Sequence, residues 1–264
     1  VVPNDLLDEH GSDAVRYWAA SARLGTDAAF DVGQMKVGRR LAIKVLNAAK
    51  FVLSFELASD KVEVTEAIDK AMLASLAEVV TGASKAFESF DHTKALELTE
   101  SFFWNFTDDY LELVKERAYG QNTDPAAQAS AVSALRIALL ALTKLLAPFI
   151  PFAAEEAWSW WQEGSVHRSS WPLANELSSF AGNQNATLLS LASQALIGIR
   201  KAKSDEKLSM KAEISSLTIE ANEADIKSLK QIESDLKSVG KIDDVNYKAS
   251  ESLAISGVSF KPAQ

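Results

Sequence analysis

Apolar residues recur at steps of three and four along most of this chain, which is the spacing of one face of an α-helix. The pattern is strongest from residue 124 to residue 147. Asp124 is a good N-cap there, Pro125 suits the first helical position, and Pro148 ends the helix. The apolar face consists of Val132, Leu135, Ile137, Leu139, Leu140, Leu142, Leu145 and Leu146. A helix this apolar is expected to be buried at the centre of the fold.

The same periodicity predicts further helices before and after this one. They are expected over residues 4–10, 12–24, 34–55, 63–90, 92–118, 151–161 and 186–204. Residues 213–221, 241–249 and 252–260 alternate instead, which predicts strands, and a helix is expected at 223–239. The predicted fold class is mainly α, a helical bundle followed by a small β-α-β-β subdomain.

Changes in composition along the chain predict three consecutive parts. A connector covers residues 1–33, a helical domain covers 34–172, and the α/β subdomain covers 186–264. The segment 173–185 between the last two is rich in Ser and Asn and is expected to be a linker. Within the connector, Ser12 is expected to cap a helix on which Asp13 and Arg16 form an intrahelical ion pair.

Composition argues against several classes of site. The 264 residues include no cysteine and three scattered histidines, so neither a thiolate site nor a histidine-based metal site is predicted. No phosphate-binding glycine pattern appears, and the adjacent Asp108 and Asp109 diverge by about 100° on a helix, which disfavours paired acid and base catalysis. No catalytic residue is predicted. The sequence does not open with a basic region followed by an apolar one, and no apolar run of about eighteen residues is free of polar breaks, so we expect a cytoplasmic protein without a membrane partner.

The formal net charge of -9 disfavours a nucleic-acid partner, but the segment 34–55 is locally basic. It has no acid between Asp31 and Glu56. On a helical wheel its cations and Asn47 fall within roughly 140°, opposite the apolar residues, and Phe51 lies in the same arc. The cations are Lys36, Arg39, Arg40, Lys44 and Lys50. This face is either a solvated surface with Phe51 covered by a neighbouring helix, or an RNA surface on which Phe51 stacks against a base.

A second group of cations ends the helix predicted at 186–204. The group consists of Arg200, Lys201, Lys203 and Lys207. The helix macrodipole alone favours cations at this position, and a secondary contact with RNA is the alternative. On the residues alone, the chain is a helical binding module with one basic face, for which an acidic protein is also a possible partner.

Five segments, in order and spacing, resemble the C-terminal part of class I aminoacyl-tRNA synthetases for branched aliphatic amino acids. They read DLLDEHGSDAVRYWAASARLGTDAAFD, GQMKVGRRLAIKVLNAAKFV, FFWNFTDDYLELVKERAYG, LLAPFIPFAAEEAW and SVHRSSWP. The branch for valine is the most similar, chiefly through KVLNAAKFV and IRKAKSDEKLS, and the same region of the isoleucine or leucine branch is the alternative.

The resemblance implies a fragment that binds tRNA through a connector, an anticodon-binding bundle and an α/β appendage. The anticodon-facing helix of the family corresponds to Lys36 through Phe51, with Arg39, Arg40, Lys44, Asn47 and Lys50 along it. The implied partners are tRNA(Val), rather than DNA, and the catalytic and editing domains of the same polypeptide. The parent enzyme would use ATP and Mg²⁺ to activate the amino acid and esterify it to tRNA, whereas no cofactor is expected in this fragment.

Overall fold

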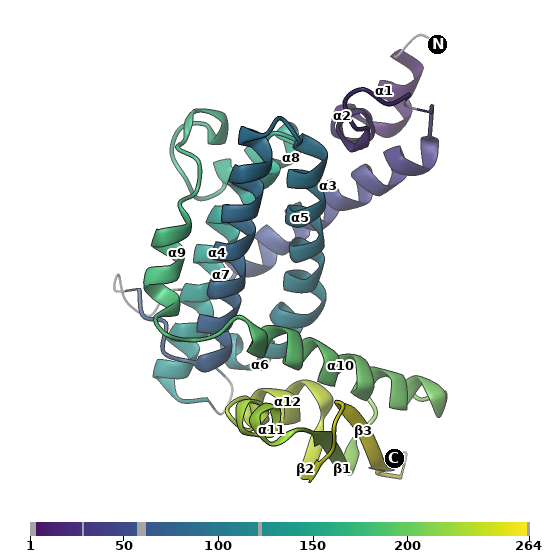
Figure 1. Ribbon diagram of the computed structural model, residues 1–264, viewed down its shortest axis with the longest axis vertical. Coiled ribbons are helices and arrows are strands. Elements are labelled where there is room, and N and C mark those ends of the chain that lie inside the picture. The colour runs from purple at the N-terminus through teal and green to yellow at the C-terminus, as the bar shows by residue number, and fades with distance from the viewer. Residues whose placement is uncertain (1–3, 28, 57–61, 121–122, 263–264) are drawn as a thin grey trace. The chain divides into compact units, whose positions relative to one another are not determined.

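The computed structural model describes residues 4–27, 29–56, 62–120 and 123–262 (Figure 1). It consists of helices along most of the chain and a three-stranded sheet near the C-terminal end, as the sequence predicts. The chain divides into two compact units, the first made of residues 1–57, 76–104 and 134–179 and the second of residues 58–75, 105–133 and 180–264. These units do not follow the three predicted parts, because α4 (Ala67–Glu88) and α7 (Pro125–Leu146) each contribute residues to both.

The first unit begins with short helices and continues with the basic segment and the bundle. Besides parts of α4 and α7, its elements are α1 (Asn4–His10), α2 (Ser12–Ser21), α3 (Val32–Leu53), most of α5 (His92–Asn105), α8 (Pro151–Ser159), the 3₁₀ turn η2 (Val166–Arg168) and most of α9 (Ala174–Ala181). The N-cap of α2 is Gly11, at φ 87°, and Ser12 is its first helical residue. The predicted cap at Ser12 is therefore wrong by one residue. A glycine suits this position because it adopts positive φ without strain.

The predicted ion pair between Asp13 and Arg16 is replaced by contacts with distant backbone. The Asp13 carboxylate accepts hydrogen bonds from the Phe152 and Ala153 amides at 3.0 and 2.7 Å. These amides lie in the first turn of α8, where no intrahelical acceptor exists. Arg16 donates from Nε to the Pro148 carbonyl at 2.8 Å. Both side chains therefore attach α2 to the segment from Pro148 to Ala153, where α7 ends and α8 begins.

The expected linker at 173–185 contains helix α9. Leu177 and Ala181 are both buried, at 4% and 3% exposure, and their spacing of four residues places them on one helical face. This short apolar stripe outweighs the Ser and Asn content, because burying it stabilises the helix.

The second unit combines the middle of the chain with its C-terminal part. Its elements, besides parts of α4 and α7, are the π-helical turn η1 (Phe106–Tyr110), α6 (Leu111–Tyr119), α10 (Thr187–Asp205), β1 (Ile214–Ala221), α11 (Glu223–Lys230), α12 (Glu233–Gly240), β2 (Ile242–Ala249) and β3 (Ala254–Phe260). The helix predicted at 92–118 is interrupted by η1. Arg200 of α10 donates to Asp109 and to the Asp108 carbonyl within this turn, both at 2.6 Å. The π turn thus exposes a carbonyl and a carboxylate to α10.

The sheet has the order β2-β1-β3, with β1 parallel to β2 and antiparallel to β3. The crossover from β1 to β2 contains α11 and α12, where the sequence predicts one helix at 223–239. Pairing between β1 and β3 is irregular between Ile214 and Thr218, and this irregularity explains why Ile214 and Leu217, three residues apart, are both buried. Gly198 of α10 allows close packing, because a Cβ atom there would lie 2.5 Å from Ile255 Cγ1.

Helix α7 is buried, as its composition predicts. Of the described helices, it alone is long and apolar enough to cross a membrane, with a mean hydropathy of 1.7 over the window tested, but 72% of that window is buried inside the protein. It is therefore a core helix. Asp124 accepts a hydrogen bond from the Ala126 amide at 3.5 Å, and the helix begins at Pro125, which confirms the predicted start.

Candidate nucleic-acid interface

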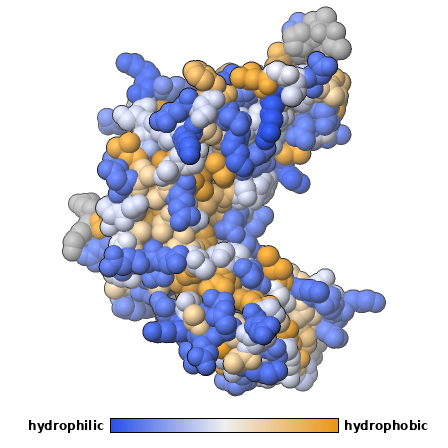
Figure 2. Space-filling model, in the orientation of Figure 1, coloured by the Kyte–Doolittle hydropathy of each residue, from blue (hydrophilic) through white to orange (hydrophobic). Residues whose placement is uncertain are grey.

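Helix α3 carries the predicted basic face and is capped by Asp31. The Asp31 carboxylate accepts hydrogen bonds from the Gly33 and Gln34 amides at 2.7 and 3.4 Å. One side of the helix is buried, and its residues are Met35, Gly38, Leu41, Val45, Ala48, Ala49 and Val52. Hydrophilic residues cover much of the face of the molecule drawn in Figure 2, with apolar residues between them.

The structure places most of the predicted contact residues at the surface. Lys36, Arg39, Arg40, Asn47 and Lys50 are exposed, while Lys44 and Phe51 are partly buried. The Phe51 ring packs edge-on against Phe55, with their centroids 4.9 Å apart. The predicted segregation of α3 into a core side and a basic side is therefore present, and Phe51 is held by an aromatic neighbour.

Two tryptophans from distant segments lie beside the cations of α3. The guanidinium carbon of Arg40 lies 5.2 Å from the centroid of the Trp104 ring, and Lys44 Nζ lies 5.9 Å from it. Lys50 Nζ lies 5.4 Å from the centroid of the Trp160 ring. All three distances are within the range of cation–π attraction. Sequence reasoning does not select either tryptophan for this surface, because 60 or more residues separate each from its cations along the chain.

Each of these tryptophans is oriented by a glutamate one helical turn earlier. Trp104 donates from Nε1 to Glu100 at 3.1 Å, and Trp160 donates from Nε1 to Glu156 at 3.0 Å. Glu100 also accepts a hydrogen bond from the Tyr17 hydroxyl at 2.6 Å. Burial, together with this hydrogen bond and the charge of Glu100, raises the pKa of Tyr17 well above its ordinary value of 10.0.

Arg39 differs from its neighbours on α3 because it contacts backbone rather than an aromatic ring. Its Nη1 donates to the Glu9 carbonyl at 2.8 Å. Glu9 lies near the end of α1, where the last carbonyls of a helix lack intrahelical donors. Arg39 therefore joins the basic face to the N-terminal helices while its side chain stays exposed.

The second group of predicted contact residues is divided by the structure. Lys201 and Lys207 are exposed, and Arg200 is partly buried against Asp109. Lys203 is 2% exposed, and its ammonium donates to the carbonyls of Gly240 at 2.8 Å and Met210 at 3.0 Å. The expectation that Lys203 lies on an RNA-facing surface is wrong, because its charged group is used inside the protein. Burial, with a smaller effect from the nearby Lys241, lowers the pKa of Lys203.

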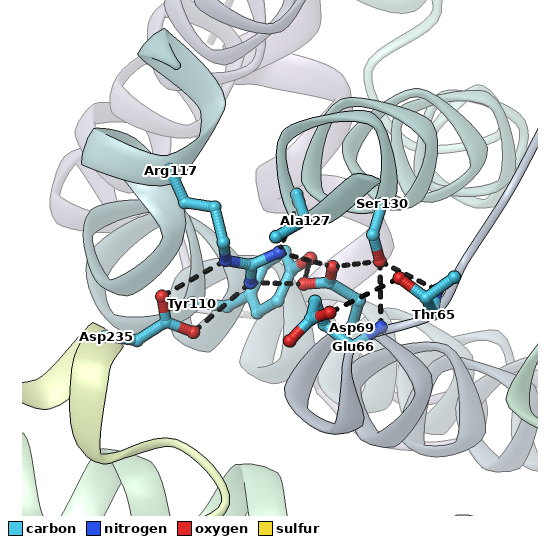
Figure 3. Close-up of polar contacts among 8 residues, drawn as sticks. All are labelled: Thr65, Glu66, Asp69, Tyr110, Arg117, Ala127, Ser130 and Asp235. Carbon is cyan, nitrogen blue, oxygen red and sulfur yellow. Dashed lines mark hydrogen bonds and ion pairs between the residues drawn. The ribbon is translucent and has the colours of Figure 1, made fainter. Parts of the chain in front are cut away.

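A buried polar network, which sequence reasoning does not identify, lies in the second unit (Figure 3). Arg117 of α6 donates to Asp69 of α4 at 2.7 and 2.9 Å and to Asp235 of α12 at 3.1 and 3.2 Å. Asp69 also accepts hydrogen bonds from the Tyr110 hydroxyl at 2.8 Å and from the Ser130 hydroxyl at 2.6 Å. Every member of the network has a partner, so we interpret it as a structural junction of α4, α6, α7 and α12.

Burial and neighbouring charges shift the pKa values of Arg117 and Asp235. Burial opposes the charge of Arg117, but Asp69 and then Asp235 outweigh burial and raise its pKa above the ordinary value. Burial raises the pKa of Asp235, although Arg117 opposes the shift. Within the described part of the chain, no group of three or more His, Asp and Glu side chains is placed to hold a metal ion.

The chain is similar to known proteins along its whole length. The family model described as "Anticodon-binding domain of tRNA ligase" matches residues 69–220. The valine–tRNA ligase of Leifsonia xyli subsp. xyli is 51% identical over 268 residues, covering 100% of this chain and 31% of that protein. The valine–tRNA ligase of Salinispora arenicola is 52% identical over 265 residues, covering 93% of this chain and 31% of that protein.

A solved structure is similar at lower identity. It is the "LeuRS-tRNA-LeuAMS" ternary complex of Agrobacterium radiobacter K84, with a TM-score of 0.47 and 16% identity, covering 97% of this chain and 30% of that chain. The chain spans about a third of the length of the curated relatives it matches. The segment matched by the family model includes Trp104 and Trp160, whereas α3 precedes it. This chain belongs to the family of anticodon-binding domains of tRNA ligases.

Proposed function

We propose that this chain is the tRNA-binding region of a valine–tRNA ligase and that it holds the anticodon stem and loop of tRNA(Val). The observation that carries this proposal is the row of cations on one side of α3, of which Lys36, Arg39, Arg40 and Lys50 are exposed. Such a row suits a polyanion, because phosphate groups are bound mainly by lysine and arginine. The 51% identity to a valine–tRNA ligase over the whole chain supports valine as the amino acid.

The proposed roles differ along α3. Lys36, Arg39 and Arg40 are placed to contact phosphates, which fixes the position of the RNA without reading its sequence. Asn47 and Phe51 offer an amide and a ring to the unpaired bases of the loop, where hydrogen bonds and stacking provide specificity. Lys44 adds charge between these two parts, and Lys50 adds charge beside Phe51.

The cations at the end of α10 form a weaker proposed surface. Lys201 and Lys207 are exposed, and Arg200 retains partial exposure although it pairs with Asp109. We assign these three to secondary phosphate contacts and leave Lys203 out of the set, since its ammonium is enclosed. A contact made through backbone phosphates alone would add affinity without specificity.

The remaining proposals concern the whole protein. The parent enzyme would activate valine with ATP and Mg²⁺ and esterify it to tRNA in the cytoplasm. Catalytic and editing domains of the same polypeptide would carry out the chemistry, and this chain alone would have no aminoacylation activity. Its part would be to select and orient the tRNA.

The test is the affinity of the chain for a valine-accepting tRNA and for the same tRNA with its anticodon replaced, at two salt concentrations. With about four phosphate contacts on loop RNA, the slope of log affinity against log salt should be roughly -3. Tighter binding to the valine anticodon with such a slope supports anticodon recognition. Preference for an isoleucine or leucine anticodon would assign the chain to another branch of the family. Absence of binding at low salt would contradict the proposal and would favour a protein partner for the basic face.

A further inference from the structure

Two cation–tryptophan sites on α3, one at Trp104 and one at Trp160, share one arrangement of side chains. In each, a cation of α3 lies over a tryptophan ring, and a glutamate one turn before the tryptophan accepts its Nε1 hydrogen. Trp104 with Glu100 holds Arg40 and Lys44, and Trp160 with Glu156 holds Lys50. The two tryptophans come from different elements, α5 and the C-cap of α8. The same design therefore occurs twice along one helix.

The cation–tryptophan site at Trp104 is also held in place by a residue of α2. Tyr17 donates its hydroxyl hydrogen to Glu100 at 2.6 Å, so that this carboxylate accepts from both aromatic side chains. Tyr17 is 5% exposed and packs directly against α3 at Gly38, where an added Cβ atom would lie 2.5 Å from Tyr17 Cβ. The connection therefore runs from α2 through Tyr17, Glu100 and Trp104 to the cations of α3.

An aromatic ring affects a cation differently from a carboxylate. A carboxylate within an ion pair neutralises the cation and competes with a phosphate for it, whereas the quadrupole of a ring attracts the cation without cancelling its charge. A long side chain that already lies in one orientation also loses less conformational freedom when it binds. Holding cations over rings therefore prepares them for phosphates.

We propose that Trp104 and Trp160 are positioning residues for RNA binding, which hold Arg40 and Lys50 in the orientation that meets the phosphate backbone. The proposal rests on the proposed function, because it assumes that the basic face of α3 binds RNA. Arg40 and Lys50 are ten residues apart, about 15 Å along the helix, so the two cation–tryptophan sites bind separate phosphates. The rings act through the cations and make no contact with RNA.

The experiment measures the affinity of the full 264-residue chain for a valine-accepting tRNA in two double-mutant cycles. Trp104→Leu and Trp160→Leu are each made in the wild-type chain and in the chain that lacks the associated cations, Arg40→Met with Lys44→Met for the first and Lys50→Met for the second. We expect each tryptophan substitution alone to weaken binding by about fivefold, a change typical of losing exposed cation–π contacts. We expect the same substitution to have no effect once its own cations are absent.

The crossed combinations are matched controls. Trp104→Leu should keep its full effect in the Lys50→Met chain, and Trp160→Leu should keep its full effect in the Arg40→Met, Lys44→Met chain. Trp104→Phe should retain wild-type affinity within about twofold, because it keeps an aromatic face. Trp171→Leu, which removes a tryptophan that contacts Ser84 and Phe87 instead, should leave affinity unchanged.

The outcomes separate this inference from the proposed function. If the wild-type chain does not bind tRNA, the proposed function fails. If it binds but Trp104→Leu weakens binding equally with and without Arg40 and Lys44, the ring contacts RNA directly and the inference is overturned. Unchanged affinity of folded Trp104→Leu and Trp160→Leu also overturns it. Should Trp104→Leu fail to fold, Tyr17→Phe tests the same connection, with an expected loss of about twofold that vanishes in the Arg40→Met, Lys44→Met chain.

Discussion

Arginine side chains meet two opposite environments in this protein. Arg40 is exposed on α3 and lies over the ring of Trp104, whereas Arg117 is buried in the second unit between Asp69 and Asp235. The guanidinium of Arg117 is fully engaged by carboxylates and by the Ala127 carbonyl, so it can bind nothing else. The counter-group, more than the presence of a cation, therefore decides whether the charge of an arginine is available to a ligand.

The two regions also differ in what their loss would cost. A buried cation between carboxylates cannot be removed without leaving uncompensated charge, while an exposed cation over a ring is well solvated when released. Stability should therefore depend on the network around Arg117, and RNA affinity on the face of α3.

Arg117→Met should destabilise the chain by about 3 to 5 kcal/mol, because Asp69 and Asp235 would remain buried without their cation. Urea unfolding, followed by circular dichroism, measures the change in the free energy of unfolding. Arg39→Met, which removes an exposed arginine bonded to one carbonyl, is the matched control and should change stability by less than about 0.5 kcal/mol. Equal effects of the two substitutions would show that burial of Arg117 is not what makes it important.

Lys203→Met should cost about 1 to 3 kcal/mol, since the carbonyls of Gly240 and Met210 would lose their donor. Lys201→Met removes an exposed lysine from the same helix and should leave stability nearly unchanged. Thermal unfolding of both variants gives the comparison. If Lys203→Met left stability unchanged and Lys201→Met lowered it, the structural role would belong to Lys201 and not to Lys203.

Arg40→Met combined with Lys44→Met should weaken tRNA binding by about tenfold at moderate salt while lowering the unfolding free energy by at most about 2 kcal/mol, since two cation–π contacts are lost. The slope of log affinity against log salt should become shallower by about 1.4, which corresponds to two lost phosphate contacts on loop RNA. Fluorescence anisotropy at several salt concentrations measures both quantities. A loss of affinity without a change of slope would mean that these residues do not contact phosphates.

Tyr17→Phe should change the dependence of stability on alkaline pH. The pKa of Tyr17 is raised above its ordinary value of 10.0 in the folded chain, chiefly by burial and then by Glu100, so the unfolded chain releases this proton first. The contribution of Tyr17 to the free energy of unfolding is therefore complete below pH 10.0 and is lost as the pH rises above that value. The difference between the free energies of unfolding measured at pH 9 and at pH 11 should be smaller for Tyr17→Phe than for the wild type. An identical difference would contradict a buried, hydrogen-bonded phenol.

The sequence determines most of the secondary structure because the signals are local. The start of α7 follows from Asp124 and Pro125, and the end of α6 follows from Gly120, which adopts φ 71°. The separation of α3 into a core side and a basic side follows from its 3.6-residue period. These features depend on neighbours three or four residues away, and a pattern along the chain records such neighbours.

Lys203, which is predicted to lie on an RNA-facing surface, and Arg117, for which nothing is predicted, each carry a local signal of burial. Lys203 continues the buried face of Leu196 and Ile199, at steps of three and four, and Arg117 continues the buried face of Leu113. A charged residue on an apolar stripe is expected to be buried and hydrogen-bonded. The position of Lys203 near the end of a helix does not by itself reveal that it continues this buried face.

The partners of the functional residues were decided by the tertiary structure alone. Trp104 and Trp160 reach the cations of α3 because α5 and α8 belong to the same compact unit, and no pattern within α3 records that packing. The same holds for Arg117, whose two carboxylates come from α4 and α12. The sequence sets which faces are charged or apolar, because side-chain period is local. Only folding decides whether a charge meets a ring or a carboxylate, because those neighbours come from distant parts of the chain.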